Sequence, residues 1–287
     1  MARHMTEISI ISDELSLNFP EAVRLAACCG IRRIEVRALA SGRVPACAVA
    51  DRLAVEDAVR NEGITVTALS PGLFKYTDTE LAFRHELQES LPRTLELAHR
   101  WQVRKILVFG FRKSAQQDRT DARRVAVQRL AEATEIAEKA GVMLLLEPEP
   151  ICIADTGIQA AAIVRAVASP ALALNYDPGN VAWQTGKDPS PEMQEIAPVV
   201  RHLHLKDAAG GSYPAEPRWV LPGDGVVDFE TIFLSLQQQN YAGEIVLEPH
   251  MPGISSATLR SFKDRVERLW ASAQQSPISA LEVHNAM

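Results

Sequence analysis

The stretch of sequence that decides the fold is VMLLLEPEP, residues 142–150. Val142–Leu146 are all apolar, and Glu147 and Pro148 follow at once. A short, continuous apolar run is typical of a strand that is buried on both faces of a sheet, and the proline marks where the strand ends. We therefore expect a buried parallel strand here, with a carboxylate at its carboxyl end.

The same pattern recurs outward from this stretch in both directions. Eight short runs rich in Ile, Val and Leu are predicted strands: Ile8–Ile11, Ile34–Val36, Ile64–Leu69, Ile106–Phe109, Val142–Leu146, Leu172–Leu174, His202–Leu205 and Ile245–Leu247. Amphipathic segments typical of helices lie between them: Ala22–Cys29, His85–Trp101, Ala122–Ala140, Ala160–Val167, Phe229–Gln239 and Leu259–Ala273. Alternating units of this kind predict an α/β fold, a (β/α)8 TIM barrel.

An open, doubly wound sheet is the competing fold. A nucleotide-binding sheet of that kind needs a glycine-rich turn after its first strand, and here Ser12-Asp13-Glu14-Leu15 follows instead. No linker or repeat divides the 287 residues, so we expect one domain over residues 1–274 and a C-terminal tail over residues 275–287. The Pro- and Gly-rich segment Gly210–Gly225 is interpreted as a long active-site loop.

Composition argues against several classes of partner. The net charge is −6 and the basic residues fall in short clusters, which disfavours a nucleic-acid-binding face. No apolar run approaches the roughly 20 residues of a membrane span, and the N-terminal residues lack a signal-peptide pattern. The four cysteines form no C-x-x-C pair, which indicates free thiols in a reducing compartment. We expect a cytoplasmic protein that binds a small molecule.

Polar residues follow four consecutive predicted strands, at the end where barrel enzymes carry their chemistry. Glu147, Asp177 and Glu248 follow the fifth, sixth and eighth strands. The seventh carries His202 and His204 on one face, where at most one of them fits a tight coordination shell. Three carboxylates at one part of the rim would repel each other unless a divalent cation lay among them. Oxygen donors with one imidazole favour Mn²⁺ or Mg²⁺, with Co²⁺ or Zn²⁺ as alternatives.

The segments that carry these residues resemble the sugar phosphate isomerase/epimerase family of the xylose isomerase-like barrel superfamily. They are IEVR at Ile34–Arg37, LLLEPEP, NYDPGNVAWQTGKDP, VRHLHLKDA, LPGDGVVDF and GEIVLEPH, and the likeness extends from about Glu7 to Leu269. The resemblance implies the metal ligands Glu147, Asp177, His204 and Glu248, with Glu147 and Glu248 also as the catalytic acid/base pair. It implies substrate contacts at Glu35, Arg37, Asn180, His202, Lys206, Arg218 and His250. It also implies that copies of the chain can pair as a homo-oligomer.

The function implied by this resemblance is a metal-dependent isomerase or epimerase acting on a sugar, keto-sugar or sugar-acid-like substrate. The two glutamates would move a proton alpha to a carbonyl while the metal stabilises the enediolate. Lys206 or Arg218 is a candidate for binding a phosphate or carboxylate of the substrate. Trp183 and Trp219 are candidates for an apolar wall, with loop packing as the alternative. The substrate stays open, because Lys206-Asp207-Ala208 and Asn180 depart from the patterns of the family's ketose 3-epimerases.

Three other functions compete with an isomerase or epimerase for this pattern of residues. A dehydratase of the inosose or dehydroshikimate type is the main alternative, because it begins with the same proton abstraction at the same site. A DNA repair endonuclease of this superfamily would need a three-metal cluster, and the seven histidines and negative net charge argue against it. A non-catalytic sugar-binding barrel has no need of a paired acid and base.

Overall fold

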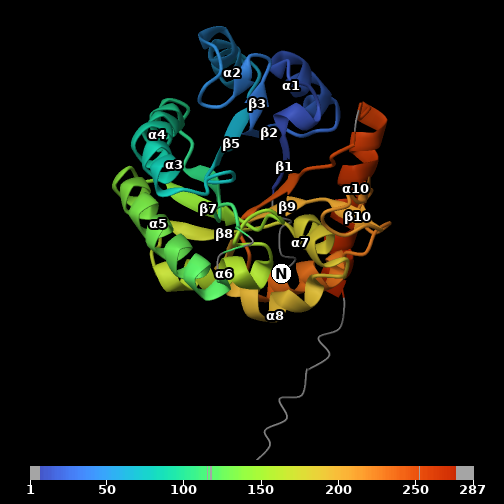
Figure 1. Cartoon of the computed structure of the whole chain (residues 1–287). Coiled ribbons are helices and arrows are strands. Elements are labelled where there is room, and N and C mark those ends of the chain that lie inside the picture. The colour runs from blue at the N-terminus through green and yellow to red at the C-terminus, as the bar shows by residue number, and fades with distance from the viewer. Residues whose placement is uncertain (1–6, 115, 117, 252, 276–287) are drawn as a thin grey trace, which may run out of the picture.

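The computed structural model describes residues 7–114, 116, 118–251 and 253–275. Its centre is a closed barrel of parallel strands in the order β1-β12-β9-β8-β7-β6-β5-β2, surrounded by helices (Figure 1). The strands are β1 (Ile8–Ile11), β2 (Arg33–Val36), β5 (Thr65–Leu73), β6 (Lys105–Phe109), β7 (Met143–Glu147), β8 (Leu172–Tyr176), β9 (Val200–Leu205) and β12 (Glu244–Leu247). Each predicted apolar run overlaps one of these strands, so the TIM barrel is confirmed.

Ten α-helices lie within the described residues. They are α1 (Phe19–Cys28), α2 (Val49–Asn61), α3 (Glu80–His85), α4 (Leu91–Arg100), α5 (Arg119–Lys139), α6 (Gly157–Val167), α7 (Pro178–Thr185), α8 (Met193–Ile196), α9 (Phe229–Gln238) and α10 (Ser256–Gln275). Short helical turns are η1 (Ser12–Glu14), the π-helical η2 (Glu86–Ser90), η3 (Ser190–Glu192) and η4 (Ala197–Val199). Residue 275 ends α10, and residues 276–287 of the predicted tail lie outside the described residues. The described helices include none that is both long and apolar enough to span a membrane.

Capping residues explain where several helices begin. Thr156 accepts a hydrogen bond from Gln159 N and starts α6, as the Asp-Thr-Gly sequence predicts. Asp118 accepts from Thr120 N and Asp121 N, so α5 begins three residues before the expected Ala122. The helix α2 is not among the predicted helices, and its N-cap Ala48 makes no side-chain hydrogen bond that would mark its start. The single predicted helix over His85–Trp101 is instead α3, η2 and α4 in succession, starting at Glu80.

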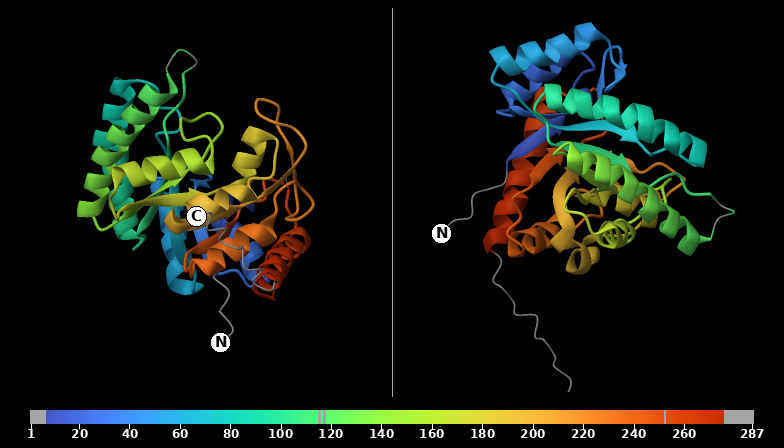
Figure 2. Two further views of the ribbon diagram at one scale, coloured as in Figure 1. Left: turned by 90° about the horizontal axis from the view of Figure 1, so that it is seen from below. Right: turned by 90° about the vertical axis from the view of Figure 1, so that its left-hand side faces the viewer.

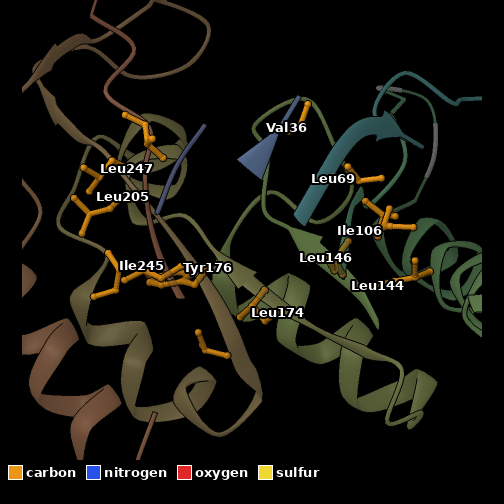
Figure 3. Close-up of a cluster of buried hydrophobic side chains, with 14 of the residues drawn as sticks. Val36, Leu69, Ile106, Leu144, Leu146, Leu174, Tyr176, Leu205, Ile245 and Leu247 are labelled. Atoms are coloured by element: carbon orange, nitrogen blue, oxygen red, sulfur yellow. The ribbon is translucent and has the colours of Figure 1, made fainter. Parts of the chain in front are cut away.

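Strand side chains alternate between the helix layer and the barrel interior. Leu144 and Leu146 of β7 and Leu174 of β8 belong to the large apolar core shared with the helices, part of which is drawn in Figure 3. The residues between them face inward, where a small apolar layer consists of Ala68, Leu107, Leu145 and Ala173. This alternation puts the next inward positions at the carboxyl-end rim: Glu147 on β7, and Asn175 on β8 followed by Asp177 just past the strand.

Two antiparallel hairpins extend the rim. β3 (Ala38–Leu39) pairs with β4 (Gly42–Arg43) directly after β2, and β10 (Asp207–Ala209) pairs with β11 (Arg218–Val220) after β9. In the left view of Figure 2, the β10–β11 hairpin and the segment after β6 project from the same end of the barrel. The segment Gly210–Gly225, expected to be a loop, therefore includes a strand and the tip of a hairpin.

The end of that hairpin is fixed by Asp207. Its carboxylate accepts hydrogen bonds from the backbone N–H groups of Ala208, Gly223, Gly225 and Val227 at 2.9–3.2 Å. A buried carboxylate that receives four backbone donors ties the two ends of the segment together. Asp207 thus has a structural role beside the site, and it keeps β11 next to the rim.

Candidate metal centre

Four side chains converge at the carboxyl-end rim from β7, the start of α7, β9 and the end of β12. Glu147, Asp177, His204 and Glu248 are all buried, and one ligand atom from each lies within 4.8 Å of the others. Because β7, β8, β9 and β12 are consecutive in the barrel, their carboxyl ends place these residues side by side. The structure thus brings together the four residues that the resemblance implies as ligands.

Glu147 is held by amide groups rather than by a cation. Asn175 Nδ2 donates to its Oε2 at 3.1 Å, and Asn180 Nδ2 donates to its Oε1 at 3.1 Å. Burial raises the pKa of Glu147 to about 7, and the negative charges of Glu248 and Asp177 add to the rise, while His204 opposes it. Glu147 therefore titrates near neutral pH in a fixed orientation.

Asp177 serves two purposes through its two oxygens. Oδ1 accepts from Asn180 N and caps the first turn of α7, while Oδ2 lies 2.6 Å from Lys206 Nζ. Oδ2 makes no well-aligned hydrogen bond to a side chain or backbone group of the described residues. Burial raises the pKa of Asp177, and Lys206 opposes the rise. One oxygen thus fixes the residue, and the other faces the cluster.

His204 presents one ring nitrogen to the cluster. Its Nδ1 lies 3.2 Å from Glu248 Oε2 and 3.6 Å from Glu147 Oε2 without an aligned hydrogen bond to either. Its Nε2 lies 3.1 Å from Glu35 Oε2, at the opposite side of the ring. Burial alone would lower the pKa of His204, but Glu35 and Glu147 raise it well above its usual value. Nδ1 thus faces the cluster without an aligned hydrogen bond, where a metal ligand would be needed, and binding of a divalent cation there would compete with protonation of the ring.

Glu248 lies between two cationic side chains. Arg37 Nη1 donates to its Oε1 at 2.6 Å, and Lys206 Nζ donates to its Oε2 at 2.8 Å. Burial alone would raise the pKa of Glu248, but Lys206 and His250 lower it well below its usual value. The pKa values of Glu147 and Glu248 are therefore shifted in opposite directions, which is the usual sign of a pair with distinct acid and base roles.

The donor set fits a divalent cation. Glu147, Asp177 and Glu248 carry three negative charges when ionised, and the ammonium of Lys206 lies against two of them. Asp177 Oδ2 and His204 Nδ1 are buried and make no aligned hydrogen bond within the described residues, so these two ligand atoms remain available to a cation. Carboxylate oxygens with one imidazole suit Mn²⁺, Mg²⁺, Co²⁺ or Zn²⁺, and the Nε2 contact of His204 with Glu35 is the outer support that metal-bound histidines have.

The residues expected to contact substrate occupy three different places. Arg37, Asn180, Lys206 and His250 line a pocket of about 530 Å³ that also exposes Glu147, His204 and Glu248. Glu35 and His202 are fully buried and do not line the pocket. His202 Nε2 lies 3.0 Å from Glu35 Oε2, and Glu35 in turn contacts His204. Arg218 is exposed on β11 and is not among the residues lining the pocket.

Lys206 and Arg218 are the candidates for binding a substrate anion, and the structure places them in different surroundings. Lys206 is buried with its ammonium on Asp177 and Glu248, because it follows β9 at the centre of the rim. Arg218 points away because its neighbour Trp219 takes the inward position on β11. Both anion-binding roles therefore stay predictions, because the charge of Lys206 is already paired and Arg218 lies outside the residues that line the pocket.

Other pocket residues were missed by sequence reasoning. Lys75 follows β5 and pairs with Glu149 at 2.9 Å, while Arg43 and Arg112 follow β2 and β6. All three occur in loops or hairpins after strands, without a motif to mark them; only their position after a predicted strand could have identified them. Trp183 and Trp219 line the pocket as an edge-to-face pair with ring centroids 6.1 Å apart, and so form an apolar wall.

Comparisons with known proteins agree with this fold. A family profile described as xylose isomerase-like TIM barrel matches residues 23–270. Among curated proteins, L-ribulose-5-phosphate 3-epimerase UlaE of Escherichia coli is 27% identical over 201 residues, which cover 69% of each chain. The protein of the same name from Shigella flexneri matches with the same figures.

Solved structures resemble the whole barrel. The IolI protein with a bound zinc atom has a TM-score of 0.76 at 18% identity, covering 93% of this chain and 98% of that one. An L-ribulose 3-epimerase has a TM-score of 0.73 at 20% identity, covering 94% and 96%. A probable 3-DHS dehydratase, AsbF of Bacillus anthracis, has a TM-score of 0.71 at 18% identity, covering 91% and 99%. At these identities the likeness establishes the fold.

Proposed function

The chain belongs to the xylose isomerase-like TIM barrel family, and on that premise we propose that it is a divalent-metal-dependent isomerase or epimerase of a sugar-like substrate. The observation that carries the proposal is the cluster of Glu147, Asp177, His204 and Glu248, whose ligand atoms lie within 4.8 Å of one another. The curated relatives named as epimerases support an enzymatic function of this class. The zinc atom of the IolI protein supports a metal at such a site, and the oxygen-rich donor set favours Mn²⁺ or Mg²⁺ here.

The metal would be held by the four clustered residues and would act as a Lewis acid for negative charge that develops on a substrate carbonyl oxygen. The protein groups supply the proton transfers. Glu248 stays ionised beside Arg37 and Lys206 and is suited to accept the proton alpha to the carbonyl. Glu147, held in a fixed orientation by Asn175 and Asn180, is suited to return a proton as the second carboxylate of the pair. Two carboxylates acting from different sides of the carbon invert it, whereas one acting alone gives aldose–ketose isomerisation.

Asn175 and Asn180 keep Glu147 in place during this exchange. Each donates one amide hydrogen bond to a different oxygen of the carboxylate, so the group cannot rotate freely. Asn180 Nδ2 also donates to Pro148 O at 3.0 Å, which fixes the amide itself. Positioned carboxylates react faster because orientation is settled before the reaction. Trp183 and Trp219 limit the water that reaches the same pocket.

A dehydratase is the second candidate, and its support is the likeness to the probable 3-DHS dehydratase. It would use the same proton abstraction and then expel a beta hydroxyl group. The two reactions differ in product: an epimerase returns a keto-sugar of the same mass, whereas a dehydratase forms an enone by loss of water. Ultraviolet absorbance of the enone and the mass of the product separate the two candidates.

The proposed function is tested by proton exchange at carbon. The Mn²⁺-loaded protein is incubated in D₂O with L-ribulose 5-phosphate, L-ribulose and other keto-sugars, and the hydrogen next to the carbonyl is followed by NMR. We expect metal-dependent exchange with at least one member of the panel, lost after chelation and lost in Glu248→Gln, which removes the group that abstracts the proton. Exchange that survives chelation contradicts the proposal, as does protein that binds no divalent ion.

A further inference from the structure

The cations that line the pocket differ in whether they have an anionic partner. Arg37 is paired with Asp13, Glu14 and Glu248, and its three ion pairs are 2.6–2.9 Å long. Lys75 is paired with Glu149. Lys206 is paired with Asp177 and Glu248. These cations are neutralised by the protein and have little capacity left for a ligand.

Arg43 has no carboxylate partner among the described residues. Its Nε donates to the backbone oxygen of Ser70 at 2.9 Å, and its Nη2 lies 3.5 Å from Ser70 Oγ. Both partners are neutral, although the side chain is half-buried and lines the pocket. Burial and the nearby charge of Arg37 lower the pKa of Arg43, yet an arginine keeps its charge under such conditions. Asp13, Glu147 and Glu248 oppose this lowering from a distance, but none of them forms an ion pair with Arg43, so its guanidinium keeps N–H groups that an oxyanion can accept from.

A second unpaired arginine lies in the same pocket. Arg112 follows β6, its side chain is exposed, and the described residues offer it no ion-pair partner. Lys113 and Arg119, which lie close in sequence, are instead both paired with Asp155. The pocket thus contains two guanidinium groups that have no carboxylate partner among the described residues. Each can form a bidentate hydrogen bond with a carboxylate or phosphate.

The two arginines stand on the half of the rim that lacks the metal ligands. In the order of the barrel, β7, β8, β9 and β12 are contiguous and lead to Glu147, Asp177, His204 and Glu248. Arg43 and Arg112 follow β2 and β6, which belong to the other contiguous half of β1, β2, β5 and β6. One pocket therefore has an acidic half, where a cation and the reacting carbons belong, and a half with unpaired positive charge.

We propose that Arg43 and Arg112 bind an oxyanion, a phosphate or carboxylate, carried by the substrate at the end remote from its reacting carbons. This inference rests on the proposed function and extends it to the class of substrate: a keto-sugar that is phosphorylated or oxidised to an acid. Arg43 selects that class, because a neutral sugar would leave its charge without a partner. Its bond to Ser70 O holds the guanidinium toward the pocket, so the group is oriented before the anion arrives.

The proposal is tested by anion binding to the full-length, chelator-treated protein, so that no metal takes part. Inorganic phosphate and glycolate are titrated by calorimetry into wild type, Arg43→Gln, Arg112→Gln and the control Arg123→Gln, which removes an exposed arginine of α5 outside the pocket. We expect saturable binding of at least one anion by wild type and weakening by about tenfold or more in Arg43→Gln. Arg112→Gln should weaken binding as well, and Arg123→Gln should match wild type. The anion that binds more tightly identifies phosphate or carboxylate as the substrate group.

Equal binding by wild type, Arg43→Gln and Arg112→Gln overturns the proposal, and so does the absence of anion binding by wild type. If thermal unfolding shows that Arg43→Gln is misfolded, Arg112→Gln decides, because the side chain of Arg112 is exposed. Titration of Mn²⁺ into the same variants is a separate readout and should be unchanged by Arg112→Gln. Failure of Mn²⁺ binding in wild type would defeat the proposed function and leave the anion result standing.

A kinetic comparison gives a second readout. For L-ribulose 5-phosphate and L-ribulose, Arg43→Gln should lower kcat/KM for the phosphorylated sugar by about tenfold more than for the neutral one, if both exchange. An equal loss for the two sugars would assign Arg43 a structural role and contradict the proposal.

Discussion

Glu35 Oε2 lies 3.1 Å from His204 Nε2, on the side of the imidazole ring that faces away from the carboxylate cluster. Both side chains are buried, and Glu35 stays ionised, because His204 and His202 outweigh burial and lower its pKa to about 2. An ionised acceptor at Nε2 keeps the hydrogen of a neutral imidazole on that nitrogen and leaves Nδ1 free to face Glu248. Glu35 is therefore a positioning residue for the proposed metal ligand.

Replacing Glu35 tests that relationship. Glu35→Gln keeps the size of the side chain but removes its charge, so we expect Mn²⁺ affinity to fall by about 10- to 100-fold. Calorimetric titration of Mn²⁺ measures the effect, and thermal unfolding checks the fold. Glu56→Gln, on α2 and remote from the cluster, is the control and should bind as wild type does. An unchanged affinity in Glu35→Gln would show that the histidine needs no such support.

The proposed acid/base pair makes a prediction about turnover. Glu147→Gln and Glu248→Gln should each reduce turnover by about 10² or more, since each removes a group that carries a proton. Circular dichroism should remain that of a folded barrel. The exposed Glu230→Gln on α9 is the control and should retain full activity. Near-normal activity in either site variant rules out the role assigned to it.

Metal binding is predicted to depend on pH. Glu147 has a pKa of about 7, and the pKa of His204 is raised well above its usual value, so both hold protons that a cation must displace. The apparent affinity for Mn²⁺ should therefore rise as pH increases from about 6 to 8, and binding should release protons. Calorimetry in two buffers with different ionisation enthalpies counts the released protons. A pH-independent affinity with no proton release contradicts these protonation states.

Stability should respond to pH through Glu192, which lies in η3 outside the site. Burial raises its pKa to about 7, against opposing hydrogen bonds from the backbone N–H groups of Gly157 and Ile158. The folded state therefore binds a proton more tightly than the unfolded state, in which the pKa is near 4.5. Its contribution to stability is fully present at low pH and is lost as pH rises through the range from about 4.5 to 7.

Glu192→Gln should remove this loss. From pH 5 to pH 8, the free energy of unfolding of wild type should fall, relative to that of the variant, by on the order of 1–2 kcal/mol. Urea unfolding at the two pH values measures the difference. Glu230→Gln changes an exposed residue of α9 by the same chemistry and serves as the control. A variant with the same pH dependence as wild type would show that Glu192 is ionised throughout.

Alternation along the strands made the cluster predictable from sequence. Leu145 and Glu147 share the inward face of β7, and His202 and His204 share that of β9, so the polar rim residues follow from a two-residue period. The apolar runs likewise determined the barrel, because strands buried on both faces leave few other folds. Metal ligation and the acid/base roles remain predictions that rest on this placement.

Features that depend on contacts between distant segments could not be read in the same way. The β10–β11 hairpin directs Trp219 into the pocket and Arg218 out of it, and no local pattern in Gly210–Gly225 indicates that pairing. Lys206 likewise pairs with Asp177 and Glu248, which lie about 30 and 40 residues away in sequence, so no local pattern indicates these ion pairs. The sequence pattern therefore predicts which residues gather at the rim, but not which of them form ion pairs with one another.

The most direct test of the central claim is anomalous X-ray diffraction from crystals of the Mn²⁺-loaded protein. We predict one strong manganese peak per chain, bound by Glu147, Asp177, His204 Nδ1 and Glu248 at about 2.0–2.3 Å. A manganese peak elsewhere, or full loading with no peak among these four residues, would contradict the proposed metal centre.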